Sequence, residues 1–305
     1  MISISRPLAS ALLLGALVAR PVVAQSTKAP DVVLRLDDIG MNHSVNQAIE
    51  EVAKTGMPIS ASVLFVCPWY QEAVDILKKY PNVTVGVHVA LNSEWRGYRW
   101  GPVLGKGGVP SLVDSAGYLL PSVPAFLKSK YDLAEVEREL SAQMDRAMAS
   151  GLKIAYLDPH MGTAAATPQL REVMERVARK YHVGISTYFD ERYNSIWGTA
   201  PNAKKSQLLD VLGKAPTDRP TLVEVHVAER TPEMNAIVDM NAEEQNAPGA
   251  GVVDHRKAEL ETMLSPELAA LNTSGKIKLL TYEQLITKQG GHSAMHRPAP
   301  ECPTP

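Results

Sequence analysis

The sequence lacks two features that would indicate particular classes of protein. Beyond its N-terminus it has no apolar stretch that approaches the roughly 20 consecutive residues needed for a membrane-spanning helix. It also has no basic block, because 31 Lys and Arg are offset by 33 Asp and Glu to give a formal net charge of -2. Nothing therefore supports a nucleic-acid or anionic-membrane partner.

Cysteine is scarce, with only Cys67 and Cys302 in 305 residues. An oxidising compartment would permit a bridge between them, which would tie the C-terminal tail to the body of the protein. Two separate thiols are equally compatible with the sequence, because nothing in it brings the two residues together.

The N-terminus carries the pattern of a secretory signal peptide over residues 1–24. Arg6 supplies a short positive region, residues 8–19 an apolar stretch, and residues 22–24 a cleavage site of small side chains. We therefore expect an exported chain, periplasmic or extracellular, with no integral membrane span after the signal is removed. Arg20 leaves an uncleaved N-terminal anchor open.

Strand-like and helix-like segments alternate along the rest of the chain. Apolar periodicity predicts helices near residues 45–52, 70–77, 133–147, 168–181 and 254–270, and later strands near 59–66, 85–91, 154–158, 183–187, 222–227 and 276–281. Ser44 and Thr167 are the expected N-caps of the first and fourth of these helices. The alternation predicts an α/β fold, an irregular TIM-like (β/α) barrel.

No internal linker rich in Pro, Gly or Ser divides the chain, so we expect a single domain over residues 25–289. Residues 92–123 interrupt the alternation and are rich in Gly, Pro, Trp and Tyr. An insertion of this length usually serves a binding site, and we expect it near the site. Residues 290–305 are predicted to be a disordered tail.

Asp and His recur at the ends of the predicted strands. Asp37 and Asp38 follow an apolar run, His88 lies within a later strand, and His160 follows the next. In a barrel these positions share one face, so the side chains would meet, together with His226. Imidazole and carboxylate suit zinc and other divalent metals, and three protein ligands leave open positions for water and substrate. The pattern predicts metal-assisted hydrolysis.

Each of these residues also has a purely structural interpretation. Asp37 and Asp38 could cap a helix or lie in a solvated loop. His88 could be a hydrogen-bonded core residue, residues 158–160 could form a turn, and His226 could be satisfied by the backbone. Their joint occurrence at strand ends favours a functional site.

The same segments resemble the motifs of the YdjC-like, or chitooligosaccharide deacetylase, family. Residues 37–40, with Asn46, resemble its Asp-Asp-Phe-Gly motif, residues 86–89 its Gly-Leu-His-Leu motif, and residues 156–160 its His-x-Asp-x-His motif. Residues 224–226 resemble its late Glu/His strand motif. Arg256 with Glu259 and residues 281–285 resemble its C-terminal Arg/Glu helix and its Thr-Tyr-x-x-Leu motif. The resemblance covers nearly the whole mature chain. Ile39 and Tyr156 depart from the family pattern, which bears on the substrate more than on the metal site.

The resemblance implies a metal-dependent hydrolase that removes acetyl groups from N-acetylated sugars or oligosaccharides. Asp38, His88 and His160 would be the metal ligands, Asp37 the base that acts on a metal-bound water, and His226 a candidate acid that protonates the leaving amine. Two imidazoles and one carboxylate accept several divalent metals, and we expect zinc or magnesium, with zinc slightly preferred.

The insertion supplies the expected substrate contacts. Trp95, Tyr98 and Trp100 are suited to stacking on sugar faces, and Arg96 to a hydroxyl-rich or anionic group. Asp158 is grouped with them as a substrate-binding residue. The alternative is that the aromatic residues pack the insertion onto the barrel.

Two other functions remain open for this sequence. One is an exported glycan-binding protein without catalysis, and the other is metal-assisted hydrolysis of an ester, glycosidic or phosphate bond on the same scaffold. A base beside a metal ligand favours an enzyme, because a protein that only binds has no physical need for Asp37.

Overall fold

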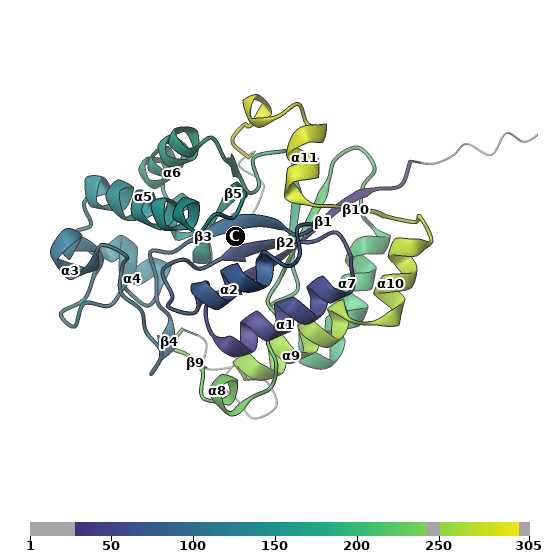
Figure 1. Cartoon of the computed structure of the whole chain (residues 1–305), viewed down its shortest axis with the longest axis horizontal. Helices are drawn as coiled ribbons and strands as arrows, with labels where there is room; N and C mark the ends of the chain where they lie inside the picture. Colours follow the sequence, from purple (N-terminus) through teal and green to yellow (C-terminus); the bar gives the residue numbers. More distant parts are fainter. Residues whose placement is uncertain (1–27, 242–250, 299–305) are drawn as a thin grey trace, which may run out of the picture.

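The computed structural model describes residues 28–241 and 251–298, so the predicted signal peptide and Cys302 lie outside the described residues. Figure 1 shows a central twisted sheet with helices packed around it. The strands are β1 (Asp31–Ile39), β2 (Ser60–Val63), β3 (Thr84–Val89), β4 (Trp95–Arg96), β5 (Ile154–Pro159), β6 (Gly184–Ile185), β7 (Arg192–Ser195), β8 (Thr221–Val225), β9 (Val238–Asp239) and β10 (Lys278–Leu280). The helices are α1 (His43–Lys54), α2 (Tyr70–Leu77), α3 (Gly105–Gly108), α4 (Val123–Lys128), α5 (Leu133–Ala149), α6 (Pro168–Tyr181), α7 (Lys204–Gly213), α8 (Pro232–Asn235), α9 (Val252–Met263), α10 (Pro266–Thr273) and α11 (Tyr282–Lys288).

The main sheet is parallel, with strand order β6-β5-β3-β2-β1-β8-β7, and β10 adds to the start of β1. Among the described residues β6 and β7 do not pair, so the predicted α/β fold is confirmed, but the predicted irregular TIM-like barrel is a curled half-barrel that does not close. A parallel neighbour needs a crossover of about a dozen residues. The six residues 186–191 between these two strands cannot provide one.

The link between β6 and β7 contains a buried acidic residue, Glu191. The carboxylate of Glu191 accepts hydrogen bonds from the backbone N–H groups of Thr187 and Phe189, at 3.1 and 2.7 Å, and from the hydroxyl of Tyr282 at 2.7 Å. The short link from β6 to β7 is thus held by side-chain hydrogen bonds in place of strand pairing.

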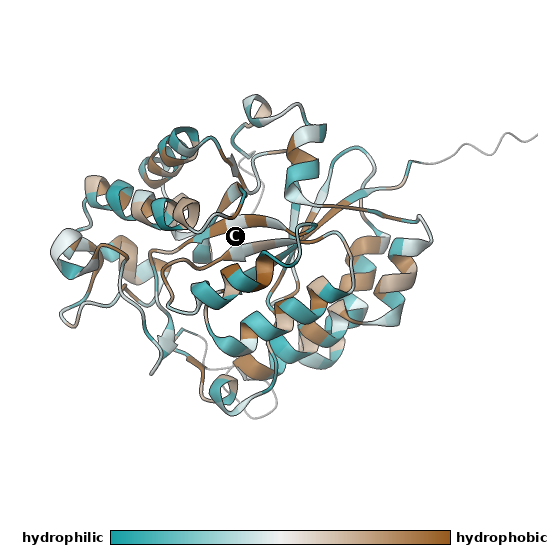
Figure 2. Ribbon diagram, viewed as in Figure 1, coloured by the Kyte–Doolittle hydropathy of each residue, from teal (hydrophilic) through white to brown (hydrophobic). Residues whose placement is uncertain are grey.

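The helices form because an apolar stripe can be buried against the sheet. Figure 2 shows brown apolar faces turned inward and teal polar faces turned outward on the helices around the sheet. α6 is capped by Thr167 as predicted, because its side chain accepts from the backbone N–H of Leu170. α1 is instead capped by Asn42, and the predicted helix over 254–270 is two helices because Ser265 and Pro266 start a new one.

The 92–123 insertion packs against the body of the domain. Its short strand β4 pairs antiparallel with β9, and Figure 1 shows the two side by side at one edge of the molecule. The buried carboxylate of Glu139 on α5 accepts from the backbone N–H groups of Val103 and Leu104 at 2.8 and 3.1 Å. These bonds fix the middle of the insertion.

Part of the predicted disordered tail is in fact packed on the domain. Arg297 makes two hydrogen bonds to Glu175 on α6, at 2.6 and 2.9 Å, and the backbone N–H of His296 donates to Tyr188. Residues 299–305 lie outside the described part. Cys67 is buried and has no disulfide partner among the described residues, which do not include Cys302. None of the helices in the described ranges has both the length and the apolar character to cross a bilayer.

Candidate active site

The carboxyl ends of the central strands open into a cavity of about 280 Å³. This is the edge of a parallel sheet where α/β proteins place their ligands. Its lining residues come from seven strands, the loops around them and α9: Asp37, Asp38, His88, Glu94, Trp95, Pro159, His160, Met161, Tyr193, Trp197, Glu224, His226, Asp239 and Arg256.

A distortion of β1 turns both adjacent aspartates toward this cavity. Neighbouring residues of a regular strand point to opposite faces. Here the register with β2 shifts between Leu36 and Ile39, and Asp38 has a left-handed φ of 69°. Aspartate tolerates this conformation better than most residues do. The bulge explains why the carboxylates of Asp37 and Asp38 both line the cavity.

Three of the predicted ligands converge on one point. Oδ1 of Asp38 lies 3.4 Å from Nε2 of His88 and 3.5 Å from Nδ1 of His160, and the two nitrogens are 3.1 Å apart. Ligands at zinc-binding distances in a tetrahedral site are separated by about 3.3 Å. Oδ1 of Asp38 is buried and has no hydrogen-bond partner within the described residues. The spacing therefore fits a single divalent ion.

Each of the two histidines is backed by a carboxylate on its far side. Nδ1 of His88 lies 2.7 Å from Oδ2 of Asp158, and Nε2 of His160 lies 3.0 Å from Oε2 of Glu94. Such partners fix the tautomer of a metal-binding histidine and raise its basicity. Both remaining nitrogens then present lone pairs to the same point, an arrangement that a cation stabilises.

The proton affinities of these two histidines agree with a site built for positive charge. Burial opposes their charging, but Asp37 and Asp158 raise the pKa of His88 well above its ordinary value. Against the same effect of burial, Glu94 and Asp38 raise the pKa of His160 to about 9.

Asp38 behaves as an ionised ligand. Burial works against its charge, yet Arg256 and the two histidines hold its pKa well below the usual range. Nη2 of Arg256 donates to Oδ2 of Asp38 at 2.5 Å, which leaves Oδ1 for the ion.

A single buried guanidinium, that of Arg35, pairs with three other carboxylates in and behind the cavity wall. Its Nε and Nη2 donate to Asp37 at 2.8 and 2.7 Å, while Nη1 lies 2.7 Å from Asp158 and Nη2 lies 3.1 Å from Glu224. Two further His/carboxylate groupings share these residues, but their carboxylates already pair with Arg35. They therefore suit a cation less well than the grouping of Asp38, His88 and His160.

Asp37 combines a fixed position with a raised proton affinity. Burial and the nearby charge of Asp158 raise its pKa, and the paired Arg35 opposes this only in part. A carboxylate held by two hydrogen bonds beside a metal-type site, and more basic than usual, has the properties of a general base.

His226 also reaches the cavity, but its surroundings differ from those of the other two histidines. Its backbone N–H donates to Glu259 at 2.6 Å, and its ring lies edge-on to Trp197 at 5.2 Å. Burial, with a smaller contribution from Arg256, lowers its pKa well below the ordinary value. This histidine is therefore neutral near pH 7.

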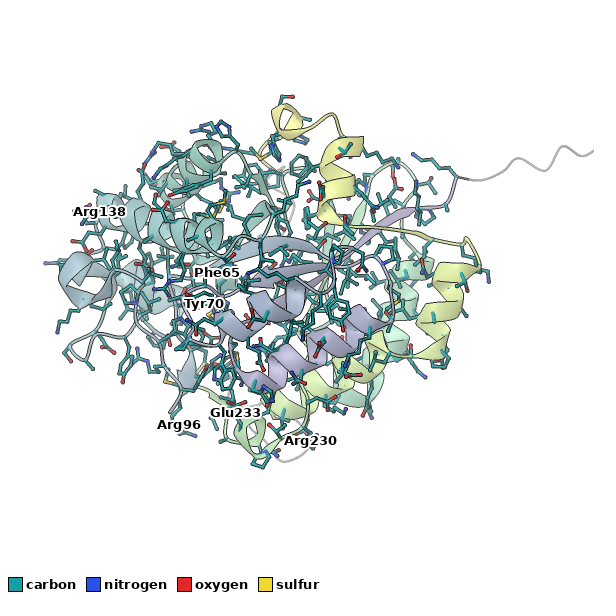
Figure 3. The ribbon with its side chains drawn as sticks, in the orientation of Figure 1. Phe65, Tyr70, Arg96, Arg138, Arg230 and Glu233 are labelled. Carbon is teal, nitrogen blue, oxygen red and sulfur yellow. The ribbon has the colours of Figure 1, made fainter. Side chains whose placement is uncertain are left out.

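The structure brings one of the predicted substrate contacts, Trp95, to the cavity wall. The guanidinium of Arg256 lies 5.5 Å from the centre of its ring. Arg96, the second residue of β4, is exposed and lies at the edge of the molecule in Figure 3. It is absent from the cavity lining. Alternation along β4 accounts for this, because successive residues point to opposite sides.

The other three predicted contacts lie behind the cavity wall and do not line it. Trp100 is buried, with its ring 6.0 Å from that of His160. The hydroxyl of Tyr98 donates to the backbone carbonyl of Met41. Asp158 is fully buried behind His88. Packing, the alternative interpretation, describes these aromatic residues better.

Several site residues had no predicted role. Arg35 could have been found from its spacing, since it lies two residues before Asp37 on the same strand and so on the same face. Glu94 and Trp197 lie in irregular segments with no pattern to point to them. Arg256 and Glu224 were noted only as parts of family motifs.

Comparisons with known proteins identify a family that matches most of this chain. Residues 31–273 match the model of the family described as YdjC-like protein. The chain is 26% identical over 269 residues to a carbohydrate deacetylase from Brevibacillus brevis, covering 83% of this chain and 99% of that protein. It is 31% identical over 155 residues to a carbohydrate deacetylase from Enterococcus faecalis, covering 50% and 57%.

A solved structure shares the fold. It is that of an Enterococcus faecalis protein described as a cellobiose-phosphate cleavage protein, with a TM-score of 0.67 and 24% identity over 84% of this chain and 99% of that one.

Proposed function

The chain belongs to the YdjC-like family, and from this we propose that it is a metal-dependent hydrolase that removes acetyl groups from N-acetylated sugars or oligosaccharides. The carbohydrate deacetylases among its relatives support the reaction and the substrate class. The observation that carries the proposal is the convergence of Asp38, His88 and His160, with a carboxylate behind each histidine.

The three ligands would hold the ion, and two imidazoles favour zinc over magnesium. A divalent ion in this position supplies a Lewis acid for the acetyl carbonyl and makes water easier to deprotonate. Asp158 and Glu94 keep the imidazoles of His88 and His160 in the orientation that binding needs.

The remaining residues would handle protons and the sugar. Asp37, held by Arg35, takes the proton of the attacking water, and His226 delivers a proton to the amine nitrogen as the C–N bond breaks. Trp95 and Trp197 line the cavity and offer ring faces to the sugar.

Acetate release by the purified protein tests this proposal. The assay uses a panel of N-acetylated sugars with added zinc, with added magnesium and with a chelator, and Asp37→Asn is the control for contaminating activity. Metal-dependent release that this variant lacks is the expected result. A protein that holds a metal ion and releases no acetate would point to a different bond, and one that binds no metal would point to glycan binding without catalysis.

We further propose that the mature protein works outside the cytoplasm, because residues 1–24 have the pattern of a signal peptide. Expression of the full chain followed by cell fractionation tests this. Recovery outside the cytoplasm, with a mature N-terminus after Ala24, is expected. A chain that stays cytoplasmic with its N-terminus intact would contradict the proposal.

A further inference from the structure

We propose that Glu224 supplies the proton that reaches the leaving amine through His226. This inference rests on the proposed deacetylase function and assigns the source of the proton within that site. Glu224 acts through His226, so we describe it as a positioning and proton-supplying residue.

The two side chains lie together on one face of the sheet. Glu224 is in β8 and His226 directly follows the strand, two residues later, so alternation directs both to the cavity, which both line. Oε1 of Glu224 lies 3.8 Å from Nδ1 of His226. That nitrogen is buried and has no hydrogen-bond partner within the described residues. A small rotation of either side chain would close the distance to a hydrogen bond.

The other contacts of Glu224 determine which oxygen carries a proton. Oε2 already accepts from the hydroxyl of Tyr193 at 2.6 Å and from Nη2 of Arg35 at 3.1 Å. Among the described residues Oε1 is hydrogen-bonded only to the hydroxyl of Ser195, at 3.2 Å, and a hydroxyl can rotate to become an acceptor. A proton on Glu224 is therefore placed on Oε1, the oxygen that faces His226.

The charges around the pair favour a proton on Glu224 rather than on His226. Glu224 faces Arg35 and Asp37 from β1, Asp158 from β5 and Tyr193 from β7; burial and the charge of Asp37 raise its pKa to about 7. Burial has the opposite effect on the imidazole and lowers the pKa of His226. At neutral pH Glu224 is thus protonated about half of the time, while His226 is neutral and can accept at Nδ1.

The proton transfers balance over the reaction. As the C–N bond breaks, the amine nitrogen takes the proton of His226 Nε2, and Nδ1 of His226 takes the proton of Glu224 Oε1. Glu224 is left as a carboxylate, which the guanidinium of Arg35 and the hydroxyl of Tyr193 stabilise. Asp37 holds the proton of the attacking water. The starting state is restored when Asp37 loses its proton to solvent, Nδ1 of His226 returns its proton to Glu224, and Nε2 takes one from solvent.

The decisive experiment compares Glu224→Gln with the wild-type protein on two kinds of substrate. Glutamine keeps the shape and the hydrogen bonds of the side chain but cannot deliver a proton. We expect kcat for an N-acetylated sugar to fall by about 100-fold or more, with metal content unchanged. Hydrolysis of 4-nitrophenyl acetate, whose leaving group needs no proton, should fall by much less. Glu191→Gln, which disturbs a buried glutamate away from the cavity, is the matched structural control, and any loss that it causes should be equal on both substrates.

The pH profile gives a readout that a merely structural role would not change. Activity requires protonated Glu224, so kcat/KM of the wild-type protein should decline as pH rises through about 7. This decline, the basic limb of the pH profile, should be absent from the profile of Glu224→Gln. The double variant Glu224→Gln/His226→Gln should be no slower than His226→Gln alone, since the two residues act as one unit.

The possible failures can be told apart. A Glu224→Gln variant with full sugar turnover, or with equal losses on both substrates and an unchanged basic limb, would overturn the inference while leaving the deacetylase function intact. If the wild-type protein releases no acetate from any sugar, the proposed function fails instead. In that case the ¹⁵N NMR shift of His226 Nδ1 still tests the contact between Glu224 and His226. This shift should change in Glu224→Gln and stay the same in Glu191→Gln.

Discussion

Histidines on the two sides of the cavity have pKa values shifted in opposite directions. On the side of β3 and β5, His88 and His160 each have a carboxylate behind the ring and a pKa above the ordinary value. On the side of β8, the ring of His226 has no carboxylate at hydrogen-bond distance among the described residues, and its pKa is well below the ordinary value. The difference shows that the placement of carboxylates, rather than the histidine itself, sets the proton affinity of each ring.

The largest expected effect comes from removing a ligand on the metal side. His88→Ala should lose both the bound ion and turnover, by about 1,000-fold or more, because two ligands hold a divalent ion poorly. Metal analysis of the purified variant, together with acetate release, checks this. A variant that keeps a full equivalent of metal would mean that the ion is held elsewhere.

Asp37→Asn separates ion binding from proton transfer. Because Asp37 is expected to remove the proton of water without binding the ion, the variant should retain metal while kcat falls by about 100- to 10,000-fold. Metal content, kcat and the unfolding midpoint should be measured on one preparation. Undiminished turnover would rule out the general-base role.

Smaller effects are expected from the carboxylates behind the histidines. Asp158→Asn and Glu94→Gln should each weaken metal affinity by about 10- to 100-fold, because such partners orient the ligands. Glu224→Gln, on the other side of the cavity, should leave metal affinity unchanged. Competition with a chromophoric chelator measures all three variants. Equal losses of metal affinity in all three variants would contradict the distinction between the β3/β5 side and the β8 side of the cavity.

The smallest effect concerns the sugar. Trp95→Ala should raise KM by about fivefold, because an aromatic contact contributes about 1 kcal/mol beyond area burial. Trp100→Ala should leave KM nearly unchanged and act instead on kcat, since its ring packs on His160 and does not line the cavity. Steady-state kinetics with one N-acetylated sugar compare the pair. A KM that rises only for Trp100→Ala would reverse the assignment.

The positions of Asp37, Asp38, His88, His160 and His226 at one cavity were predictable from the sequence. Each lies in or at the end of an apolar strand, and parallel strands bring their carboxyl ends to one edge. Their different pKa shifts were harder to predict from the sequence, because these shifts depend on charged partners from other elements.

The substrate contacts and the closure of the sheet were predicted less well, for a related reason. Arg96 and Trp95 face different ways because β4 pairs with β9, a contact between distant parts of the chain. The gap between β6 and β7 depends on a link too short for a crossover, and only the first of these two strands was predicted. Local periodicity predicts elements well and long-range pairing poorly.

The bulge in β1 also limits how this chemistry could be moved to another protein. A designer who copied the Asp-Asp pair onto a regular strand would obtain one carboxylate in the cavity and the other on the opposite face. The smallest segment that could be transplanted is the distorted β1 together with β2, because the register shift between these two strands accompanies the left-handed conformation of Asp38. Backbone geometry, as much as residue identity, would have to be transplanted.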